Sequence, residues 1–563
     1  ARQMAMQIVN DSRQGDGFAL VLMADPPRVV VSHPATDARD FLSELEGLQL
    51  VHGGADLPAT LAKVESLCRE AAGQGLARCE VFFLSDLARN TWSPKFSGEQ
   101  AAQDFRLRLE RLAQLGAMVV VDLGQDQAEN NCITQFGLTD ALAIAGRDLQ
   151  FAGQLRHFGR NPGGEQRLAL FVDGHRTAET SATLGSDGLA SFSFKCRFET
   201  PGDHTLEVRT GGDALPLDDV RYATLTVRDA IGVLCVNGKP GPKLLGAADF
   251  VQLALDPQAD SRLSPAHVEV ILESGLAERD LAELDCLFLC NVGQLTAREA
   301  QRVASFVRGG GGVALWLGDQ VLAERYNLLL HDDAQSRLLP GRLQDIVSAP
   351  GGSLHVDTLG YRHPLVREFS GHEDAGLLQV LVQTYWRLTL PAAGSARAAL
   401  AVQGGDPLLV AEEIGRGRVV VLTTDGSLSS VRRAGGERWS SLPGNPSFPA
   451  LVQEMVQWLV AARGQGRNVA VLEPLGGLIA SNEEHASWSM QTPLGRQPVR
   501  IESQNGETRW SFADTTVAGQ YRLDRGAEPG SSLHFAVNVD ASEGGKRIRR
   551  GARLWTVAVA TFK

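Results

Sequence analysis

The sequence predicts a multidomain protein in which α/β domains alternate with β domains. Three observations support this fold class. The chain has 563 residues, which is more than a single hydrophobic core organises. Two regions alternate continuous apolar segments with helical patterns, as parallel sheets covered by helices do. Two further regions show period-two alternation between turn residues and no helical pattern, which is typical of β domains.

The first predicted domain, residues 1–143, has a Rossmann-like α/β pattern. The apolar runs FALVLMA, CEVFFLSD and AMVVVDLG are predicted strands, and LPATLAKVESLCREAAGQG is a predicted helix with leucines at helical spacing. The chain starts with a helix that ends at Asn10, and no strand precedes it. Because a helix with one apolar face packs on an existing sheet, we expect that the chain is N-terminally truncated and lacks the first strand of this domain.

Residues 144–229 are predicted to form a β-sandwich. The segments DLQFAGQLRHFG, QRLALFVDGHRT, LASFSFKCRFET, GDHTLEVRT and RYATLTVRD alternate with period two. The turn sequences NPGG, VDG, GSDG and PGDH separate them. Regular strands without helices between them favour two packed sheets.

The α/β pattern resumes over residues 230–466, where IGVLCVNG, LDCLFLCNVG, GVALWLG and RGRVVVLTTDG are predicted buried strands. The segments ADFVQLALDP, AREAQRVASFVRGG and SFPALVQEMVQWLVAARG are predicted helices. Residues 467–545 return to a β pattern. In the tail, 546–563, five basic residues precede a short apolar stretch, and two interpretations stay open: the start of a membrane anchor, or a frayed or out-of-frame end.

Composition excludes several classes of protein. The net charge of −12 is spread along the chain, which argues against a nucleic-acid binder, because phosphate binding needs a basic face. The seven cysteines form no CxxC pair and no Cys/His ligand spacing, so neither a disulfide framework nor a zinc site is predicted. No apolar run approaches the roughly 18 to 20 residues that span a bilayer.

The order of these parts resembles a bacterial family of membrane proteins with a BatA-type (aerotolerance regulator) N-terminal membrane domain. Members continue into a von Willebrand factor A-like domain, an Ig-like domain and a class I glutamine amidotransferase-like domain. The resemblance rests on GDGFALVLMA, GGADLPATL and FFLSDLARNTW in the first domain, and on LRHFGRNPGG, FVDGHR and PGDHTLEVRTGGDALPLDDVRY in the second. In the third it rests on IGVLCVNGKP and FVRGGGGVALWLGDQV. The membrane segments would precede this chain.

The resemblance implies a possible metal site in the first domain. A von Willebrand A domain binds Mg²⁺ through oxygen ligands from D-x-S-x-S on its first strand, a Thr and an Asp. D-x-S-x-S does not occur in this chain, Asp56 stands at the Thr position, and Asp86 stands at the Asp position. We therefore predict no cofactor in this chain, with Mg²⁺ possible in a full-length protein and Asp86 as the one candidate ligand. The alternative is that Asp56 caps the following helix and Asp86 caps a turn.

An active amidotransferase-like domain would need a Cys nucleophile on a strand-to-helix elbow, with a His and a Glu. The expected elbow, after GGVALWLGD, contains Asp319 instead of Cys. Cys290 and Cys286 end a neighbouring strand and lie on one face of it, which indicates core positions. No catalytic residue is therefore predicted. The enzyme alternative requires Cys290, Asp319 and His372 to converge at one pocket.

Two weaker motifs lie in the predicted sandwich. Asp213, Asp218 and Asp219 in GGDALPLDD could suggest Ca²⁺, but no regular ligand spacing follows, and we interpret them as loop and turn residues. His157, His175 and His204 also lack matched spacing, so we predict no zinc site there.

The main functional hypothesis is a non-enzymatic interaction or scaffold protein that is normally membrane-anchored. The alternative is a hydrolase or amidotransferase that acts through residues 230–466. The resemblance implies protein partners, namely MoxR-type AAA+ ATPases or other Bat-like proteins, and association of the full-length protein with the bacterial inner membrane through segments outside this chain. We expect this fragment itself to be soluble, and either side of the membrane is compatible with it.

Overall fold

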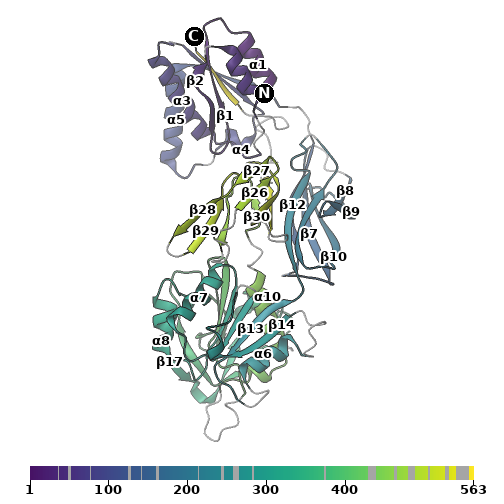
Figure 1. Cartoon of the computed structure of the whole chain (residues 1–563), viewed down its shortest axis with the longest axis vertical. Helices are drawn as coiled ribbons and strands as arrows, with labels where there is room; N and C mark the ends of the chain where they lie inside the picture. Colours follow the sequence, from purple (N-terminus) through teal and green to yellow (C-terminus); the bar gives the residue numbers. More distant parts are fainter. Residues whose placement is uncertain are drawn as a thin grey trace.

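The computed structural model describes residues 1–35, 37–48, 52–76, 78–94, 96–124, 129–140, 142–159, 164–213, 215–241, 246–257, 266–281, 284–372, 376–428, 439–461, 466–479, 488–504, 507–525, 532–540 and 557–562. Two α/β domains lie at the ends of an elongated molecule, and two β domains lie side by side between them (Figure 1). The prediction of a multidomain protein with α/β and β parts is confirmed at this level. In the described part of the chain, no helix is long and apolar enough to cross a bilayer.

The first α/β domain has a five-stranded sheet with helices on both faces (Figure 1). The strands, in spatial order, are β2 (Arg28–Ala35), β1 (Gly17–Leu22), β32 (Val557–Phe562), β3 (Cys79–Ser85) and β4 (Gly116–Asp122). The helices are α1 (Arg2–Asn10), α2 (Ala38–Glu46), α3 (Leu57–Gly73), α4 (Arg89–Trp92) and α5 (Glu99–Leu115). Helices α1 and α2 cover one face, and α3 and α5 cover the other.

The C-terminal segment occupies the centre of this sheet. β32 pairs antiparallel with β1 on one side and with β3 on the other, over six residue pairs each. Neither interpretation of the tail anticipated this strand. The physical reason is that, among the described strands, β1 otherwise pairs with β2 and β3 otherwise pairs with β4, so each has a second hydrogen-bonding edge that β32 can fill.

The β-sandwich consists of two antiparallel sheets that share one core. The smaller sheet contains β10 (Leu189–Arg197), β7 (Asp148–Phe158) and β5 (Asn130–Leu138). The larger sheet contains β6 (Ala143–Ile144), β12 (Val220–Arg228), β11 (Gly202–Arg209), β8 (Glu165–Val172) and β9 (His175–Thr183). Strand β5 precedes the predicted boundary at residue 144, and its pairing with β7 assigns it to the sandwich.

The second α/β domain is built on a nine-stranded sheet. The strand order is β14 (Ala266–Leu272), β13 (Ile231–Asn237), β15 (Cys286–Cys290), β16 (Gly312–Trp316), β23 (Gly417–Leu422), β22 (Pro407–Ile414), β21 (Arg397–Val402), β18 (Leu354–Asp357) and β19 (Leu381–Val382). A separate ribbon pairs β17 (Arg342–Ser348) with β20 (Thr384–Thr389). The first five strands in this order are parallel.

Helices cover both faces of this sheet. α6 (Ala247–Leu255), α9 (Pro364–Arg367) and α10 (Ser447–Val460) pack on one core, and α7 (Ala297–Arg308) and α8 (Ala323–Tyr326) pack on the other. Short 3₁₀ turns cover Glu273–Gly275, Pro350–Gly352, Leu359–Tyr361, Leu377–Gln379 and Leu442–Gly444, and a π-helical turn covers Asn327–Asp332. Helix α7 begins after Thr296, because Thr296 and Glu299 form a capping box in which each side chain bonds to the other residue's backbone N–H.

The C-terminal β domain contains two sheets around one aromatic core. The five-stranded sheet has β24 (Asn468–Ala470), β31 (Leu533–Asn538), β30 (Gly519–Arg525), β26 (Trp488–Thr492) and β27 (Gly495–Pro498). The three-stranded sheet has β25 (Leu475–Ile479), β29 (Glu507–Phe512) and β28 (Arg500–Gln504).

Two asparagine side chains join the C-terminal β domain to the sandwich. The Asn538 amide accepts a hydrogen bond from the Tyr222 N–H at 2.8 Å and donates one to the Tyr222 carbonyl at 3.0 Å. The Asn468 amide pairs in the same way with Thr224, at 2.8 and 3.3 Å. The two side-chain amides therefore bond to the N–H and carbonyl groups of Tyr222 and Thr224 on one edge of β12, as the backbone of a neighbouring strand would. Arg467 adds an ion pair to Asp203 at 2.7 Å.

We expect the double substitution Asn468→Ala with Asn538→Ala to loosen this interface. It leaves two N–H and two carbonyl groups of β12 without protein partners, and each lost hydrogen bond contributes about 1 kcal/mol. Amide hydrogen exchange in residues 220–226 should accelerate at least about tenfold. Asn538→Asp is the matched control, since it keeps the acceptor for Tyr222 but not the donor, and its effect should be intermediate. Unchanged exchange in the double variant contradicts the proposed role.

His52 links the first α/β domain to the C-terminal β domain. The backbone N–H of His52 donates to the Thr516 carbonyl at 2.9 Å, and the ring Nδ1 of His52 accepts from the Ala518 backbone N–H at 2.9 Å. Burial lowers the pKa of His52, which keeps Nδ1 unprotonated and able to accept. The domains are thus joined by hydrogen bonds to backbone groups at two separate interfaces.

Candidate functional site

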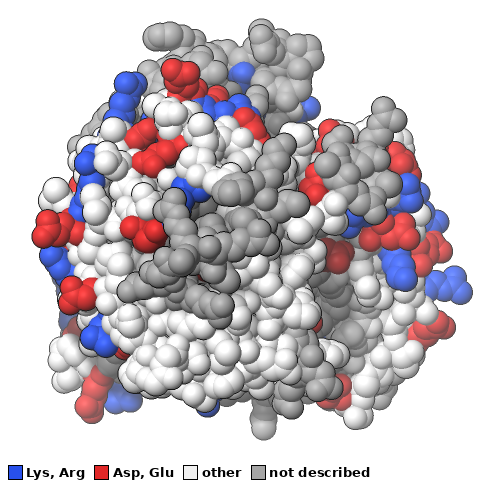
Figure 2. Space-filling view, turned by 90° about the horizontal axis from the view of Figure 1, so that it is seen from below, with Lys and Arg blue, Asp and Glu red and all other residues white. Residues whose placement is uncertain are grey.

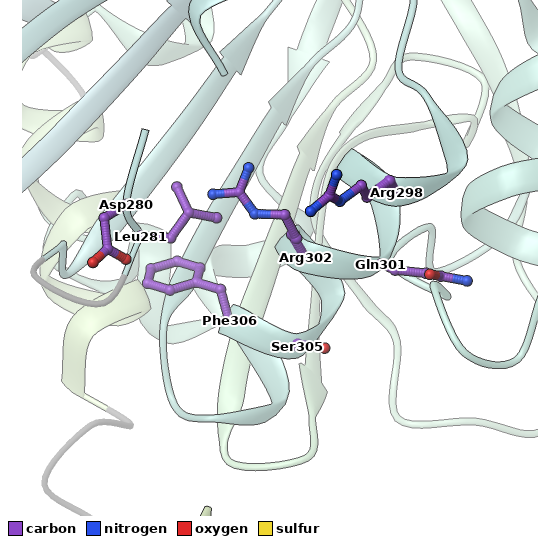
Figure 3. Close-up of a pocket in the computed structure, with 7 residues that line it drawn as sticks. All are labelled: Asp280, Leu281, Arg298, Gln301, Arg302, Ser305 and Phe306. Carbon is purple, nitrogen blue, oxygen red and sulfur yellow. The ribbon is translucent and has the colours of Figure 1, made fainter. Parts of the chain in front are cut away.

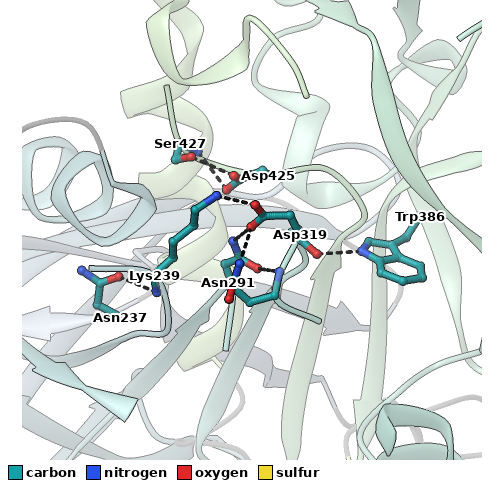
Figure 4. A network of polar contacts seen from close by, with 9 residues as sticks. Asn237, Lys239, Asn291, Asp319, Trp386, Asp425 and Ser427 are labelled. Carbon is teal, nitrogen blue, oxygen red and sulfur yellow. Dashed lines mark hydrogen bonds and ion pairs between the residues drawn. The ribbon is translucent and has the colours of Figure 1, made fainter. Parts of the chain in front are cut away.

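The candidate site lies at the carboxyl edge of the parallel strands in the second α/β domain. Strands β13, β15, β16 and β23 run parallel and end at the same edge of the sheet. In open α/β sheets this edge is where ligand sites form. A polar side chain follows each of these strands: Lys239, Asn291, Asp319 and Asp425. We call this group the strand-end network (Figure 4).

Three members of the strand-end network bond to one another, and the fourth, Asp425, bonds to Ser427. The Lys239 ammonium forms an ion pair with Asp319. The Asn291 amide donates to the Asp319 carboxylate at 2.9 Å and accepts from the Gln320 N–H at 2.9 Å. Asp425 accepts from the hydroxyl of Ser427 at 2.7 Å and from its N–H at 3.1 Å. Figure 4 shows these side chains turned toward a common centre.

The two carboxylates of this network have opposite pKa shifts. Burial raises the pKa of Asp425 to about 6, although Ser427 and Lys239 act in the opposite direction. Burial also acts to raise the pKa of Asp319, but hydrogen bonds from Lys239, Asn291 and Gln320 outweigh it and lower that pKa. Asp319 is therefore a stable anion, and only Asp425 has a pKa suited to proton transfer near neutrality.

Backbone packing leaves little room at the strand ends. Asn291 adopts a left-handed conformation with φ of 52°. A Cβ atom on Gly238 would lie 2.2 Å from the Asn291 carbonyl oxygen, and one on Gly318 would lie 2.4 Å from the Asn291 side chain. The loops after β13, β15 and β16 therefore contact one another directly. At the switch point between β13 and β15, the backbones of Gly238 and Asn291 therefore approach each other closely.

The three residues of the enzyme alternative have different surroundings. Cys290 is 1% exposed and belongs to the same core as Cys235 and Cys286, which confirms the core prediction for this strand. Burial raises the pKa of Cys290 well above its ordinary value, which disfavours the nucleophilic thiolate. His372 is exposed on a turn after α9. The side-chain hydrogen-bond partners described for Asp319 are Lys239, Asn291 and Gln320, not Cys290 or His372.

The candidate metal residues of the first α/β domain cap local structure. The Asp56 carboxylate accepts from the Ala59 N–H at 2.9 Å, which confirms that Asp56 caps helix α3. Asp86 follows β3 and accepts from the Ala88 N–H at 3.1 Å. Strands β1 and β3 are parallel, because both are antiparallel to β32, and the Asp56 N–H bonds to Ala24 just beyond β1. Asp56 and Asp86 therefore lie at the same edge of the sheet.

In the described part of the chain, no three His, Cys, Asp or Glu side chains converge as a ligand set for a metal ion. All seven cysteines are buried and carry no disulfide.

Sequence reasoning missed most of the strand-end network. It considered Asp319 at the place of a nucleophilic Cys and as a candidate group of the enzyme alternative, and it did not consider Lys239, Asn291 or Asp425. The available signal was positional, since each of these residues follows a predicted parallel strand by one to three positions. Polar residues at such positions share one edge of a sheet, whatever their separation along the chain.

Two cavities lie away from this network. One, of about 350 Å³, lies beside α7 and is lined by Arg298, Gln301, Arg302, Ser305, Phe306, Asp280 and Leu281 (Figure 3). The Arg302 guanidinium donates hydrogen bonds to the carbonyls of Ala277 and Arg279, at 2.6 and 2.5 Å. Arg302 therefore stabilises the neighbouring backbone. The other, of about 750 Å³, lies between the sandwich and the second α/β domain and has walls of mixed charge, including Arg147, Asp148 and Glu454.

Charge on the end face of the second α/β domain is mixed. Figure 2 shows basic and acidic side chains interspersed along the margins of this face, with no continuous basic stripe on it. Phosphate binding along a nucleic acid requires such a stripe.

Comparisons with known proteins give only distant similarities. A scan against protein-family models finds no match, and a search of curated proteins finds none. Among solved structures, a cytoplasmic protein from Salmonella typhimurium matches with a TM-score of 0.31 and 14% identity, covering 41% of this chain and 98% of its own. A thua-like protein from Bacteroides uniformis has a TM-score of 0.27 and 10% identity over 41% of this chain and 90% of its own.

A beta-galactosidase from Rahnella sp. R3 has a TM-score of 0.27 and 12% identity, and the match covers 58% of this chain and 40% of the enzyme. At these TM-scores the similarities support no statement about activity. Function must therefore be argued from the residues of this chain.

Proposed function

We propose that this protein is a non-enzymatic, modular interaction protein. The observation that supports the proposal is the self-contained bonding of the strand-end network. Lys239 is paired with Asp319, Asn291 binds both Asp319 and Gln320, and Asp425 is held by Ser427. At the edge where an α/β enzyme presents reactive groups, Lys239, Asn291 and Asp319 bond to one another and join the loops after β13, β15 and β16.

The connections between domains support the same proposal. The asparagine pairs at β12 and the contacts of His52 hold neighbouring domains through backbone hydrogen bonds. A protein that presents several domains to a partner gains from such fixed geometry, because less freedom is lost on binding. By the family resemblance, we propose MoxR-type AAA+ ATPases or Bat-like proteins as partners, and membrane anchoring through segments outside this chain.

The first test addresses catalysis. We expect the purified protein to release no ammonia from glutamine above the rate of a Cys290→Ala variant. Turnover that disappears in Cys290→Ala or in Asp319→Asn, while both variants remain folded by circular dichroism, would support the hydrolase alternative and refute the proposal. Asp187→Asn, an exposed turn residue of the sandwich, is the control for nonspecific effects.

The second test addresses the partner. Immobilised protein should capture a purified MoxR-type AAA+ ATPase, and Asp86→Ala should weaken this capture if the sheet edge of the first α/β domain that carries Asp56 and Asp86 contributes the contact. Asp187→Asn should leave capture unchanged. Absence of capture by the wild-type chain, with or without added Mg²⁺, removes the partner class from the proposal.

A further inference from the structure

Buried polar atoms without hydrogen-bond partners gather at one end of the β-sandwich. They are Oδ1 of Asn130, Oγ1 of Thr210, Oδ1 of Asp219 and Nε2 of His157. Each is shielded from solvent, and an unsatisfied buried polar atom costs about 1–3 kcal/mol. Several such atoms at one place indicate a binding partner that the protein chain does not supply.

Hydrogen bonds hold these residues in one cluster. The loop 210–219 closes on itself, because the Thr210 N–H donates to the Asp219 carbonyl at 2.9 Å and the Asp213 N–H donates to Oδ2 of Asp219 at 3.2 Å. The start of β5 docks on this loop, since the Asn130 amide donates to Asp218 at 2.8 Å. We call this group the loop-210 cluster.

Strand β7 completes the loop-210 cluster. The Asn131 N–H donates to Asp213 at 2.6 Å, and the Asn131 side-chain oxygen lies 2.9 Å from Nδ1 of His157. Because Asn131 Oδ1 can only accept, His157 donates from Nδ1, and its Nε2 is then an acceptor. The unpartnered atoms of Asn130, Asp219 and His157 are therefore all acceptors, and the Thr210 hydroxyl also offers lone pairs.

The chemistry of these atoms favours a cation over a neutral partner. Asp219 is 5% exposed, and the buried Asp218 is 2% exposed beside it. Burial, together with the charges of Asp213 and Asp218, raises the pKa of Asp219 to about 6, whereas its backbone bond acts in the opposite direction. The Asp219 carboxylate thus carries negative charge in a buried place, and its Oδ1 accepts no hydrogen bond there from the described residues.

We propose that the β-sandwich binds a calcium ion at the loop-210 cluster, with Asp219, Thr210 and Asn130 as ligands. Carboxylate, hydroxyl and amide oxygens are the ligand types that Ca²⁺ accepts in irregular geometry, and backbone carbonyls or waters complete its shell of six to eight oxygens. Mg²⁺ fits less well, because it requires a near-octahedral shell and keeps several waters. His157 accepts a hydrogen bond from a water of this shell.

The site differs from the regularly spaced loop sought in the sequence. Of the three proposed ligands, Asp219 and Thr210 belong to loop 210–219, and Asn130 comes from the start of β5, about 80 positions earlier in the chain. A mixed ligand set of this kind contains one carboxylate, one hydroxyl and one amide, so it needs no group of three converging acidic or His side chains in the described part of the chain.

The test uses the full chain after treatment with EDTA and buffer exchange. Isothermal titration with CaCl₂ should show one binding event, and Ca²⁺ should raise the melting temperature of the sandwich more than the same concentration of MgCl₂ does. No heat and no shift with Ca²⁺ would overturn the proposal and assign the acceptors to buried water.

Two variants and one control identify the ligands. Asp219→Asn should weaken Ca²⁺ binding by at least about tenfold, because it removes a charged ligand. In EDTA the same variant should melt no lower than wild type, because it relieves repulsion among carboxylates. Thr210→Val should also weaken binding with little change in melting in EDTA. Asp187→Asn, at another turn of the sandwich, should bind as wild type does. Binding that is unaffected by both variants would overturn the assignment.

Discussion

Deletion of residues 557–563 is expected to unfold the first α/β domain while the other three domains remain folded. β32 is the central strand of the sheet and provides a hydrogen-bonding partner for both β1 and β3. Without it, the sheet becomes two separate ribbons, β1 with β2 and β3 with β4. Such two-stranded units are at best marginally stable in water.

The loss extends to both cores of this domain. β1 contributes side chains to each face, with Ala19 and Val21 packed under α3 and with Phe18 and Leu20 packed under α1 and α2. β3 shares the first of these cores through Val81 and Phe83. A gap of one strand, about 5 Å wide on each side, would admit water to both cores.

Hydrogen exchange measures this effect. Amides in β1 and β3 should lose protection in the deletion variant, whereas amides in β13 and β15 should not. Val559→Pro should act in the same direction, because it removes a backbone N–H in a central strand opposite Leu20 and Phe82. Lys563→Pro, beyond the last residue of the strand, is the matched control. Full protection of β1 and β3 in the deletion variant would show that β32 is dispensable.

Glu65→Ala is expected to lower the free energy of unfolding of the first α/β domain by about 2–3 kcal/mol. Glu65 lies on α3 and is 6% exposed. It binds Arg69 at 2.6 Å on its own helix, and Arg108 at 3.1 Å and Arg111 at 2.8 Å on α5. Removing the carboxylate leaves three neighbouring cations without their shared ion-pair partner, although their partial exposure reduces the cost.

The pH dependence tests the same cluster. The hydrogen bond from Arg111, with smaller contributions from the other arginines, lowers the pKa of Glu65 against the effect of burial. A lowered pKa means that the stabilisation is complete above the pKa of the unfolded state, near 4.3, and is lost as the pH falls below it. The stability of wild type should therefore approach that of Glu65→Ala between about pH 5 and pH 3.

The free energy of unfolding of the first α/β domain is compared among wild type and variants by urea titration, with cleavage of that domain by a protease as the readout of unfolding. Glu110→Ala on α5 is the matched control, because Glu110 is exposed and should change stability by less than about 0.5 kcal/mol. An equal effect of Glu65→Ala and Glu110→Ala at neutral pH would show that the arginine cluster contributes no more than a surface ion pair.

Local patterns in the sequence were enough to predict the α/β and β regions and several individual roles. The apolar runs at Ile231, Cys286 and Gly312 became buried parallel strands, because period and burial are properties of neighbouring residues. Asp56 was predicted to cap a helix, and it does, because a cap depends only on residues within one turn. The core position of Cys290 followed from its apolar strand in the same way.

The roles that local pattern did not predict depend on contacts between distant segments. The place of β32 between β1 and β3 joins segments several hundred positions apart in the chain, and no local pattern specifies such a pairing. The strand-end network and the loop-210 cluster each combine residues from several strands whose polar character looked like ordinary turn chemistry. The sequence by itself determined the strands and helices of the strongly patterned segments, because propensity and periodicity are local, but it did not determine β32. Only the tertiary structure decided which polar side chains meet, because that depends on the order of strands within each sheet.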